Sequence, residues 1–188
     1  MGRRMDSRDK GLVEFRGKAM AQHAIERLQP QVGALIVNAN RNAEAYAAFG
    51  HRVVSDEVSG FAGPLAGLHA GMRECGTELI VTVPCDSPFL PSSLVLRLHE
   101  ALVQNNAEIA VASTEGQLQP VFALYKTTLL SSLEKFLTDG GRKIDKWYDA
   151  HRTVAVEFED ESAFANINTI EELSALQDDR AKRPAASA

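Results

Sequence analysis

The 188-residue chain is predicted to form one α/β domain with a mostly parallel central sheet. Short apolar runs alternate along the sequence with segments that carry apolar residues at helical spacing, which is the pattern of successive βαβ units. A hydrophobic fraction of 45% and a charged fraction of 24% are ordinary for a globular protein. We expect this domain to span residues 1–177, and residues 178–188, which lack large apolar side chains, to form a disordered tail.

Each expected element is a patterned run between turn signals such as Pro30 and Gly50. Apolar residues at helical spacing predict helices, and short apolar runs rich in β-branched residues predict buried strands. The expected helices are 19–28, 42–49, 64–75, 94–103 and 128–137. The expected strands are 32–37, 52–55, 78–83, 108–112, 121–125 and 153–158.

Charge and cysteine content exclude several functional classes. The net charge of -5 leaves no basic surface of the kind that nucleic acid or anionic lipid requires. The two cysteines lack the paired spacing of a zinc or redox motif, and no apolar run approaches the roughly 20 residues that span a bilayer. We therefore expect a cytoplasmic protein that binds small molecules or other proteins.

Polar side chains follow three of the predicted strands directly. Asn38 and Asn40 follow the first strand, Asp56 the second and Asp86 the third. Because ligands of open α/β sheets bind beyond the carboxyl ends of the strands, these residues are expected to face one crevice. The alternative is that each simply begins a turn or caps a helix, which is common for Asp and Asn.

Asp86 is the strongest single candidate. Pro84 and Pro88 restrict the backbone on both sides of it and so fix the direction of its carboxylate. One carboxylate at a strand end can hold Mg²⁺, which keeps several waters and takes its other oxygens from substrate phosphates. The alternative is a turn-forming aspartate that bonds its own backbone.

Two further segments are candidate phosphate-binding loops. Residues 2–12 contain three arginines, a lysine and two glycines, so that Lys10 and Arg4 could bind a polyphosphate; a frayed terminus would have the same composition. Residues 60–67 lead through Gly63 and Gly67 into a helix whose N-terminus could receive an anion or a base. Gly-Pro is also a common helix start, which makes this loop weak evidence on its own.

The order of these motifs resembles that of the molybdenum cofactor guanylyltransferase family over nearly the whole chain. The motifs are Arg4-Met5, Asp9-Lys10-Gly11-Leu12, Val37-Asn38-Ala39-Asn40-Arg41, Val54-Ser55-Asp56, Gly63-Pro64-Leu65-Ala66-Gly67, Pro84-Cys85-Asp86-Ser87-Pro88 and Phe164-Ala165-Asn166-Ile167-Asn168-Thr169. Pieces such as Gly-Pro-Leu-Ala-Gly occur in nucleotidyltransferases generally, whereas the complete set is typical of this family.

The resemblance implies a Rossmann-like, three-layer nucleotidyltransferase fold. It also implies transfer of GMP from GTP to the terminal phosphate of molybdenum-bound molybdopterin, release of pyrophosphate, and Mg²⁺ as cofactor. The expected partners are GTP, molybdenum-bound molybdopterin and proteins that deliver the molybdenum cofactor, with no nucleic acid and no membrane. We expect a monomer.

The resemblance also assigns roles to residues. The expected catalytic residues are Asp86, Lys10 and Arg4. The expected nucleotide-binding residues are Lys10, Asn38, Asp56, Asp86, Gly63 and Gly67. Asp86 and Asn168 are expected to bind Mg²⁺, and Arg142 and Asn166 to face molybdopterin. Because a phosphate monoester is already ionised at neutral pH, the reaction needs no strong base, and the five scattered histidines are expected to serve in packing or at the surface.

The chain departs from the family at its start. The family's first strand and the Leu-Ala-Gly-Gly that follows it have no counterpart here, so we expect the gene to begin upstream and the sheet to contain an open slot with unpaired backbone groups. Asp6-Ser7 replaces a usual glycine pair. Two alternatives stay open: the related cytidylyltransferase, which uses CTP, and a catalytically inactive nucleotide-binding module.

Overall fold

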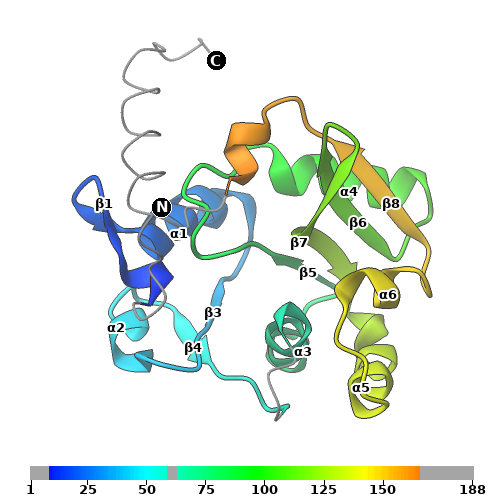
Figure 1. Ribbon diagram of the computed structural model, residues 1–188, viewed down its shortest axis with the longest axis horizontal. Helices are drawn as coiled ribbons and strands as arrows, with labels where there is room; N and C mark the ends of the chain where they lie inside the picture. The colour runs from blue at the N-terminus through cyan, green and yellow to red at the C-terminus, as the bar shows by residue number, and fades with distance from the viewer. Residues whose placement is uncertain (1–8, 59–62, 166–188) are drawn as a thin grey trace, which may run out of the picture.

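A computed structural model describes residues 9–58 and 63–165 of the chain. Its central feature is a four-stranded sheet in the order β5-β7-β6-β8 (Figure 1). The four strands are β5 (Leu79–Thr82), β7 (Gln117–Lys126), β6 (Ile109–Thr114) and β8 (Thr153–Glu157). β6 and β8 are parallel, whereas β7 runs antiparallel to both of its neighbours, so the sheet is more mixed than the mostly parallel one expected.

The antiparallel pairing of β6 and β7 originates in a two-residue hairpin loop. Glu115 and Gly116 both have positive φ angles, of 50° and 75°, which is the backbone of a turn that matches the twist of paired strands. β7 therefore begins at Gln117, four residues before the predicted start, because the turn brings it directly beside β6. The α/β class itself is confirmed, with helices on both faces of the sheet.

Alternate residues of β6 supply the two hydrophobic cores. Ala110 and Ala112 face a core formed with α4 (Leu94–Gln104) and α1 (Met20–Leu28). Ile109 and Val111 face a second core on the other side of the sheet. That core is formed with α3 (Pro64–Glu74), α5 (Leu130–Thr138) and α6 (Ile144–Tyr148). This period-2 division of a fully buried strand is what a sheet covered on both faces requires, and it makes three layers.

A smaller parallel pair of strands lies apart from the main sheet (Figure 1). β3 (Ile36–Asn38) pairs in parallel with β4 (Arg52–Val54), and α2 (Ala43–Ala47) connects them. β3 is shorter than the predicted strand 32–37. Pro30 lies in a 3-10 helix, η2 (Gln29–Gln31), and Val32 and Leu35 pack against the first core without entering a ladder.

The amino-terminal part contains short elements that the apolar pattern did not predict. A 3-10 helix, η1 (Lys10–Leu12), precedes a hairpin of β1 (Glu14–Phe15) and β2 (Lys18–Ala19). Two further 3-10 helices are η3 (Thr127–Leu129), which precedes α5, and η4 (Glu161–Phe164), which follows β8.

Within the described residues, no helix is both long enough and apolar enough to cross a bilayer.

Candidate functional site

Lys10 and Asp86 lie beside each other at one edge of the molecule. Lys10 is in η1 and Asp86 is in the turn after β5, yet the Lys10 Nζ atom is 3.9 Å from the Asp86 Oδ2 atom. The Asp86 side chain is 13% exposed, and this burial raises the pKa of its carboxyl group, while the positive charge of Lys10 opposes the rise. Two residues that the sequence placed in separate phosphate and metal roles are thus brought together.

The polar residues that follow β3 and β4 form a hydrogen-bonded cluster around Asp56. Asn38 Nδ2 donates to Asp56 Oδ1 at 3.0 Å, and Asn40 Nδ2 donates to Asp56 Oδ2 at 2.7 Å. The Asp56 backbone N–H donates in return to Asn40 Oδ1 at 2.8 Å. Because β3 and β4 are parallel neighbours, their carboxyl ends coincide, and Asn38, Asn40 and Asp56 meet as expected. That Asp86 faces the same crevice stays a prediction.

The first turns of α3 lie directly against this cluster. A Cβ atom on Gly67 would be 2.7 Å from Asn38 Oδ1, closer than side-chain atoms can approach. Gly63, which precedes the helix, has a φ of 62° and a ψ of -151°, a conformation open mainly to glycine, and Pro64 occupies the first helical turn. Both predicted glycines are therefore needed to place α3 against Asn38.

A second carboxylate, Asp9, connects η1 to α2. Tyr46 Oη donates to Asp9 Oδ1 at 2.6 Å, and Asn42 Nδ2 donates to Asp9 Oδ2 at 3.0 Å. Burial first, and then the hydrogen bond to Asp9, raise the pKa of Tyr46, so its hydroxyl group remains a donor. Neither Asn42 nor Tyr46 was predicted as a site residue, because their partner Asp9 lies more than 30 residues away in the chain.

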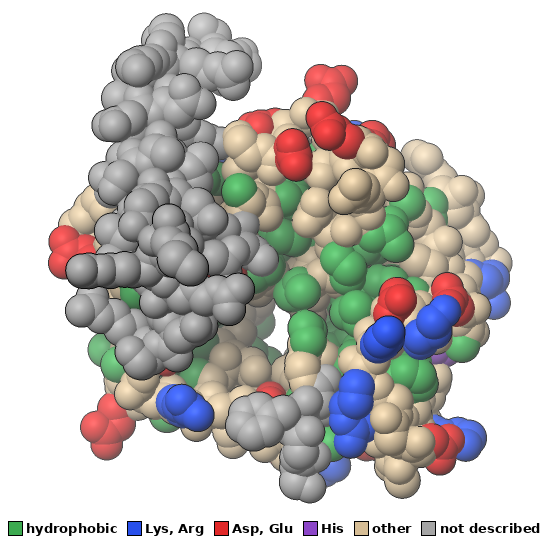
Figure 2. All heavy atoms as spheres, viewed as in Figure 1, with side chains coloured by type: hydrophobic (Ala, Val, Ile, Leu, Met, Phe, Trp, Pro, Cys, Tyr) green, Lys and Arg blue, Asp and Glu red, His purple; other side chains and the backbone are tan. Residues whose placement is uncertain are grey.

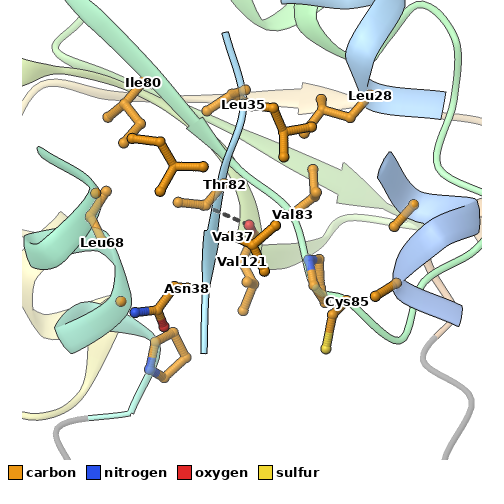
Figure 3. A pocket seen from close by; sticks show the side chains of 18 of the residues that line it. Leu28, Leu35, Val37, Asn38, Leu68, Ile80, Thr82, Val83, Cys85 and Val121 are labelled. Carbon is orange, nitrogen blue, oxygen red and sulfur yellow. Dashed lines mark hydrogen bonds between the residues drawn. The ribbon is translucent and has the colours of Figure 1, made fainter. Parts of the chain in front are cut away.

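A cavity of about 300 Å³ separates β3 from β5 (Figure 3). Its walls are mostly apolar side chains from β3, β5, α1 and α3, including Val37, Ile80 and Leu68, and Asn38 and Cys85 also line it. Among the described strands, β3 pairs with β4 alone and β5 with β7 alone, so the two edges that face the cavity carry no ladder. That a missing strand would fill the space between these two edges stays a prediction. Figure 2 shows hydrophobic side chains gathered near the centre of the face seen in that view.

The remaining predicted site residues are elsewhere. Arg142 Nη1 donates to the backbone carbonyls of Leu137 and Gly141 at 3.0 and 2.7 Å, at the carboxyl end of α5. Arg142 is at the end of α5, on the right of Figure 1, and Asp9 contacts α2, on the left, so the two residues are far apart. Arg4, Asn166 and Asn168 lie outside the described residues.

The chemistry of this edge is that of nucleotide binding without a dense metal cluster. Among the described residues, no three His, Cys, Asp or Glu side chains gather as a metal site, and Asp86 is the carboxylate beside Lys10. A cation–carboxylate pair beside the end of β5, an amide–carboxylate cluster after β3 and β4, and a glycine-bounded helix start in an α/β fold are the features of a nucleotidyltransferase.

Comparison with known proteins identifies the family. The MobA-like NTP transferase domain matches residues 1–154, and the chain belongs to this family. A molybdenum cofactor guanylyltransferase of Cupriavidus pinatubonensis is 52% identical over 177 residues, covering 92% of this chain and 89% of that protein. The protein of the same name from Ralstonia pickettii is 49% identical over 188 residues, covering 95% and 92%.

Solved structures show the same fold. Molybdopterin-guanine dinucleotide biosynthesis protein A of Archaeoglobus fulgidus has a TM-score of 0.78 at 22% identity, covering 97% of this chain and 95% of that one. A 2-C-methyl-D-erythritol 4-phosphate cytidylyltransferase of Thermus thermophilus has a TM-score of 0.71 at 16% identity, covering 93% and 94%. At these identities the likeness establishes the nucleotidyltransferase fold.

Proposed function

We propose that the chain transfers GMP from GTP to the terminal phosphate of molybdenum-bound molybdopterin, forming the guanine dinucleotide cofactor and releasing pyrophosphate. Relatives named molybdenum cofactor guanylyltransferase are about half identical to it over most of its length. The structural observation that carries the proposal is the approach of Lys10 to Asp86, at 3.9 Å, beside the carboxyl ends of the strands.

The reaction is a nucleotidyl transfer in which no protein side chain becomes covalently attached. An oxygen of the terminal molybdopterin phosphate attacks the α-phosphorus of GTP and forms a new phosphorus–oxygen bond. The bond from the α-phosphorus to the bridging oxygen of the β-phosphate breaks, and its electrons leave with pyrophosphate. Such transfers depend on positioning and charge neutralisation, which fixed cations can provide.

We propose that the following residues share this work. Lys10 places a positive charge where the triphosphate of GTP would lie, and Arg4 is proposed to assist it as negative charge grows on the leaving pyrophosphate. Asn38, Asp56 and the backbone around Gly67 form the polar wall proposed to hold the nucleoside. Gly63 gives the α3 N-terminus access to phosphate.

Asp86 fits Mg²⁺ as a single carboxylate ligand. Its side chain is largely buried and fixed after β5, and one hard oxygen donor is enough when phosphates and waters complete the shell. Asn168 is proposed as a second ligand. When bound, Mg²⁺ would neutralise charge on the phosphate oxygens. Burial raises the pKa of Asp86, and the positive charge of Lys10, 3.9 Å away, offsets part of that rise.

The acceptor side is proposed to involve Arg142 and Asn166. Arg142 Nη1 donates to two carbonyls at the end of α5, a contact that fixes the direction of the guanidinium group.

We also propose that the reaction takes place in the cytoplasm and that the protein is a monomer that works with proteins that deliver the molybdenum cofactor.

The test is pyrophosphate release by the purified chain, supplied with molybdenum-bound molybdopterin and either GTP or CTP, with and without Mg²⁺. The proposal expects release with GTP that requires Mg²⁺ and acceptor. Release with CTP alone would instead establish a cytidylyltransferase. Nucleotide binding without release would establish an inactive nucleotide-binding module.

A further inference from the structure

We infer that Asp9, Tyr46 and Asn42 are positioning residues that hold Lys10 in place for the transfer, an inference that rests on the proposed function. Lys10 is a half-buried lysine in a three-residue 3-10 helix, which has little intrinsic stability. A lysine carries several rotatable bonds, so a fixed position for its ammonium group depends on a fixed backbone. Asp9, next to Lys10, provides that anchor.

Both oxygens of the Asp9 carboxylate accept hydrogen bonds, one from Tyr46 in α2 and one from Asn42, the residue before α2. Tyr46 Oη donates to one oxygen at 2.6 Å and Asn42 Nδ2 to the other at 3.0 Å. Tyr46 is only 4% exposed, so its ring cannot move without disturbing the packing around it. The Asp9 backbone carbonyl also accepts the Leu12 N–H at 3.1 Å, which closes the turn around Lys10.

The chain around this anchor is shaped to allow the contact. A Cβ atom on Gly11 would be 2.4 Å from Tyr46 Oη, so only glycine lets the backbone after Lys10 lie against the tyrosine. Asn42 has a φ of 52°, a left-handed conformation that most side chains avoid and that asparagine tolerates. This conformation places the Asn42 amide on Asp9 immediately before α2 begins.

Asp9, the residue next to Lys10, is thus held by two hydrogen bonds. The close approach of Gly11 to Tyr46 and the left-handed conformation of Asn42 make these hydrogen bonds possible. Asn42 donates its side-chain hydrogen bond to Asp9, whereas the Tyr46 hydroxyl group, besides donating to Asp9, also interacts with the thiol of Cys85, the residue before Asp86. An effect carried by Asp9 should pass through Lys10, whereas an effect carried by Cys85 would reach Asp86 and would persist without Lys10. That dependence separates positioning from a general contribution to folding, because a general contribution would persist without Lys10.

The experiment is a double-mutant cycle between Tyr46→Phe and Lys10→Ala, with kcat/KM for GTP and the GTP dissociation constant as readouts. Tyr46→Phe keeps the buried ring and removes one hydrogen bond to a charged group, and we expect about a tenfold loss of kcat/KM. In the Lys10→Ala background the same substitution should cost less than about twofold. Equal losses in both backgrounds would overturn the inference.

Asn42→Gly provides an independent second variant. Glycine retains the left-handed backbone without strain and removes only the amide that donates to Asp9, so we expect a smaller loss that also vanishes without Lys10. The matched control is Tyr148→Phe. Its hydroxyl group donates to the Pro120 carbonyl at 2.7 Å inside the second core, and its removal should lower the melting temperature without changing kcat/KM.

The outcomes separate this inference from the proposed function. If the wild-type chain turns over GTP, and Tyr46→Phe lowers kcat/KM equally with and without Lys10, the inference is wrong and the proposed function stands. A wild-type chain that binds GTP without releasing pyrophosphate sinks the proposed function, and the cycle in GTP affinity still decides the inference. A chain that does not bind GTP overturns both.

Discussion

At the scale of single residues, the site depends on close contacts that leave no room for an extra methyl group. A Cβ atom added to Gly67 would lie only 2.7 Å from Asn38 Oδ1. We predict that Gly67→Ala displaces Asn38 from Asp56 and lowers kcat/KM for GTP about tenfold. The higher helix propensity of alanine should offset part of the strain, so the melting temperature should stay within a few degrees of wild type. Steady-state kinetics and a thermal melt measure both.

Gly71→Ala is the matched control for that substitution. It lies one turn later on α3, where an added Cβ would meet only the end of the flexible Ile80 side chain at 2.9 Å. Ile80 lines the cavity beside β5 and has space to move. Gly71→Ala should therefore retain wild-type kinetics. If both variants lose activity equally, crowding of α3 in general, not of Asn38, is responsible.

Asp86 offers a second prediction at this scale. Asp86→Asn keeps the size of the side chain but removes the charge that would hold Mg²⁺ and that faces Lys10 at 3.9 Å. We predict an intact fold and a loss of Mg²⁺-dependent pyrophosphate release of at least about a hundredfold. Circular dichroism checks the fold and a pyrophosphate assay the reaction. Turnover at the wild-type rate would remove Asp86 from the mechanism.

The sequence alone predicted the residues whose position follows from strand ends. Asn38 and Asp56 meet because parallel neighbouring strands end together, and this follows from residue order. The meeting of Asp9 with Tyr46 was not predictable in the same way. It requires η1 and α2 to be folded against each other, and no periodicity in the sequence contains that information.

At the scale of elements, a partly buried polar contact connects the residues after α6 to the first half of α5. His151 Nε2 and Ser132 Oγ are 3.0 Å apart, and the His151 ring lies edge-on to Trp147 with centroids 5.0 Å apart. Burial lowers the pKa of His151, and the nearby Glu108 only partly opposes this. The folded state therefore favours the neutral imidazole, which connects the end of α6 to α5 through its contact with Ser132.

This contact predicts a pH dependence of stability. Because the folded-state pKa of His151 lies below the unfolded value of about 6.5, the unfolded chain binds the proton first as pH falls. The contribution of His151 is therefore present above about pH 6.5 and is lost as pH falls below it. Urea unfolding at pH 7.5 and 5.5 should show a smaller difference for His151→Gln than for wild type. His99→Gln, on the exposed face of α4, controls for loss of a histidine, and equal differences in all three proteins would contradict the prediction.

The amphipathic helices were predicted at nearly their observed positions, whereas the short helix α6 was not predicted. α3 and α4 each differ from the expected range by one residue, because one face of each packs on the sheet and sets the period. α6 has five residues, fewer than two turns, and is defined by the burial of Trp147 against Tyr125, not by a repeating pattern.

At the scale of the whole molecule, the cavity between β3 and β5 divides the protein into unequal parts. The four-stranded sheet is buried on both faces, with β6 wholly covered. β3 and β4 form a two-stranded ladder of three residue pairs, and their side chains are only partly buried or exposed. Two short strands are marginal without further pairing, so their stability depends on contacts with α2 and α3.

We therefore predict that hydrogen exchange distinguishes the two parts. Amides of β6 and β7, such as those of Val111 and Leu124, should exchange only through global unfolding and be the slowest in the chain. Amides in β3 and β4, such as that of Val53, should exchange at least about a hundredfold faster, because the cavity lets this pair open without exposing the main core. Exchange measured by NMR or mass spectrometry decides this. Equal protection of both ladders would mean that the cavity is not a boundary and that Asn38 and Asp56 are held as rigidly as the central sheet. The expected difference would mean that these two residues, proposed to hold the nucleoside, lie in the part of the protein that opens first.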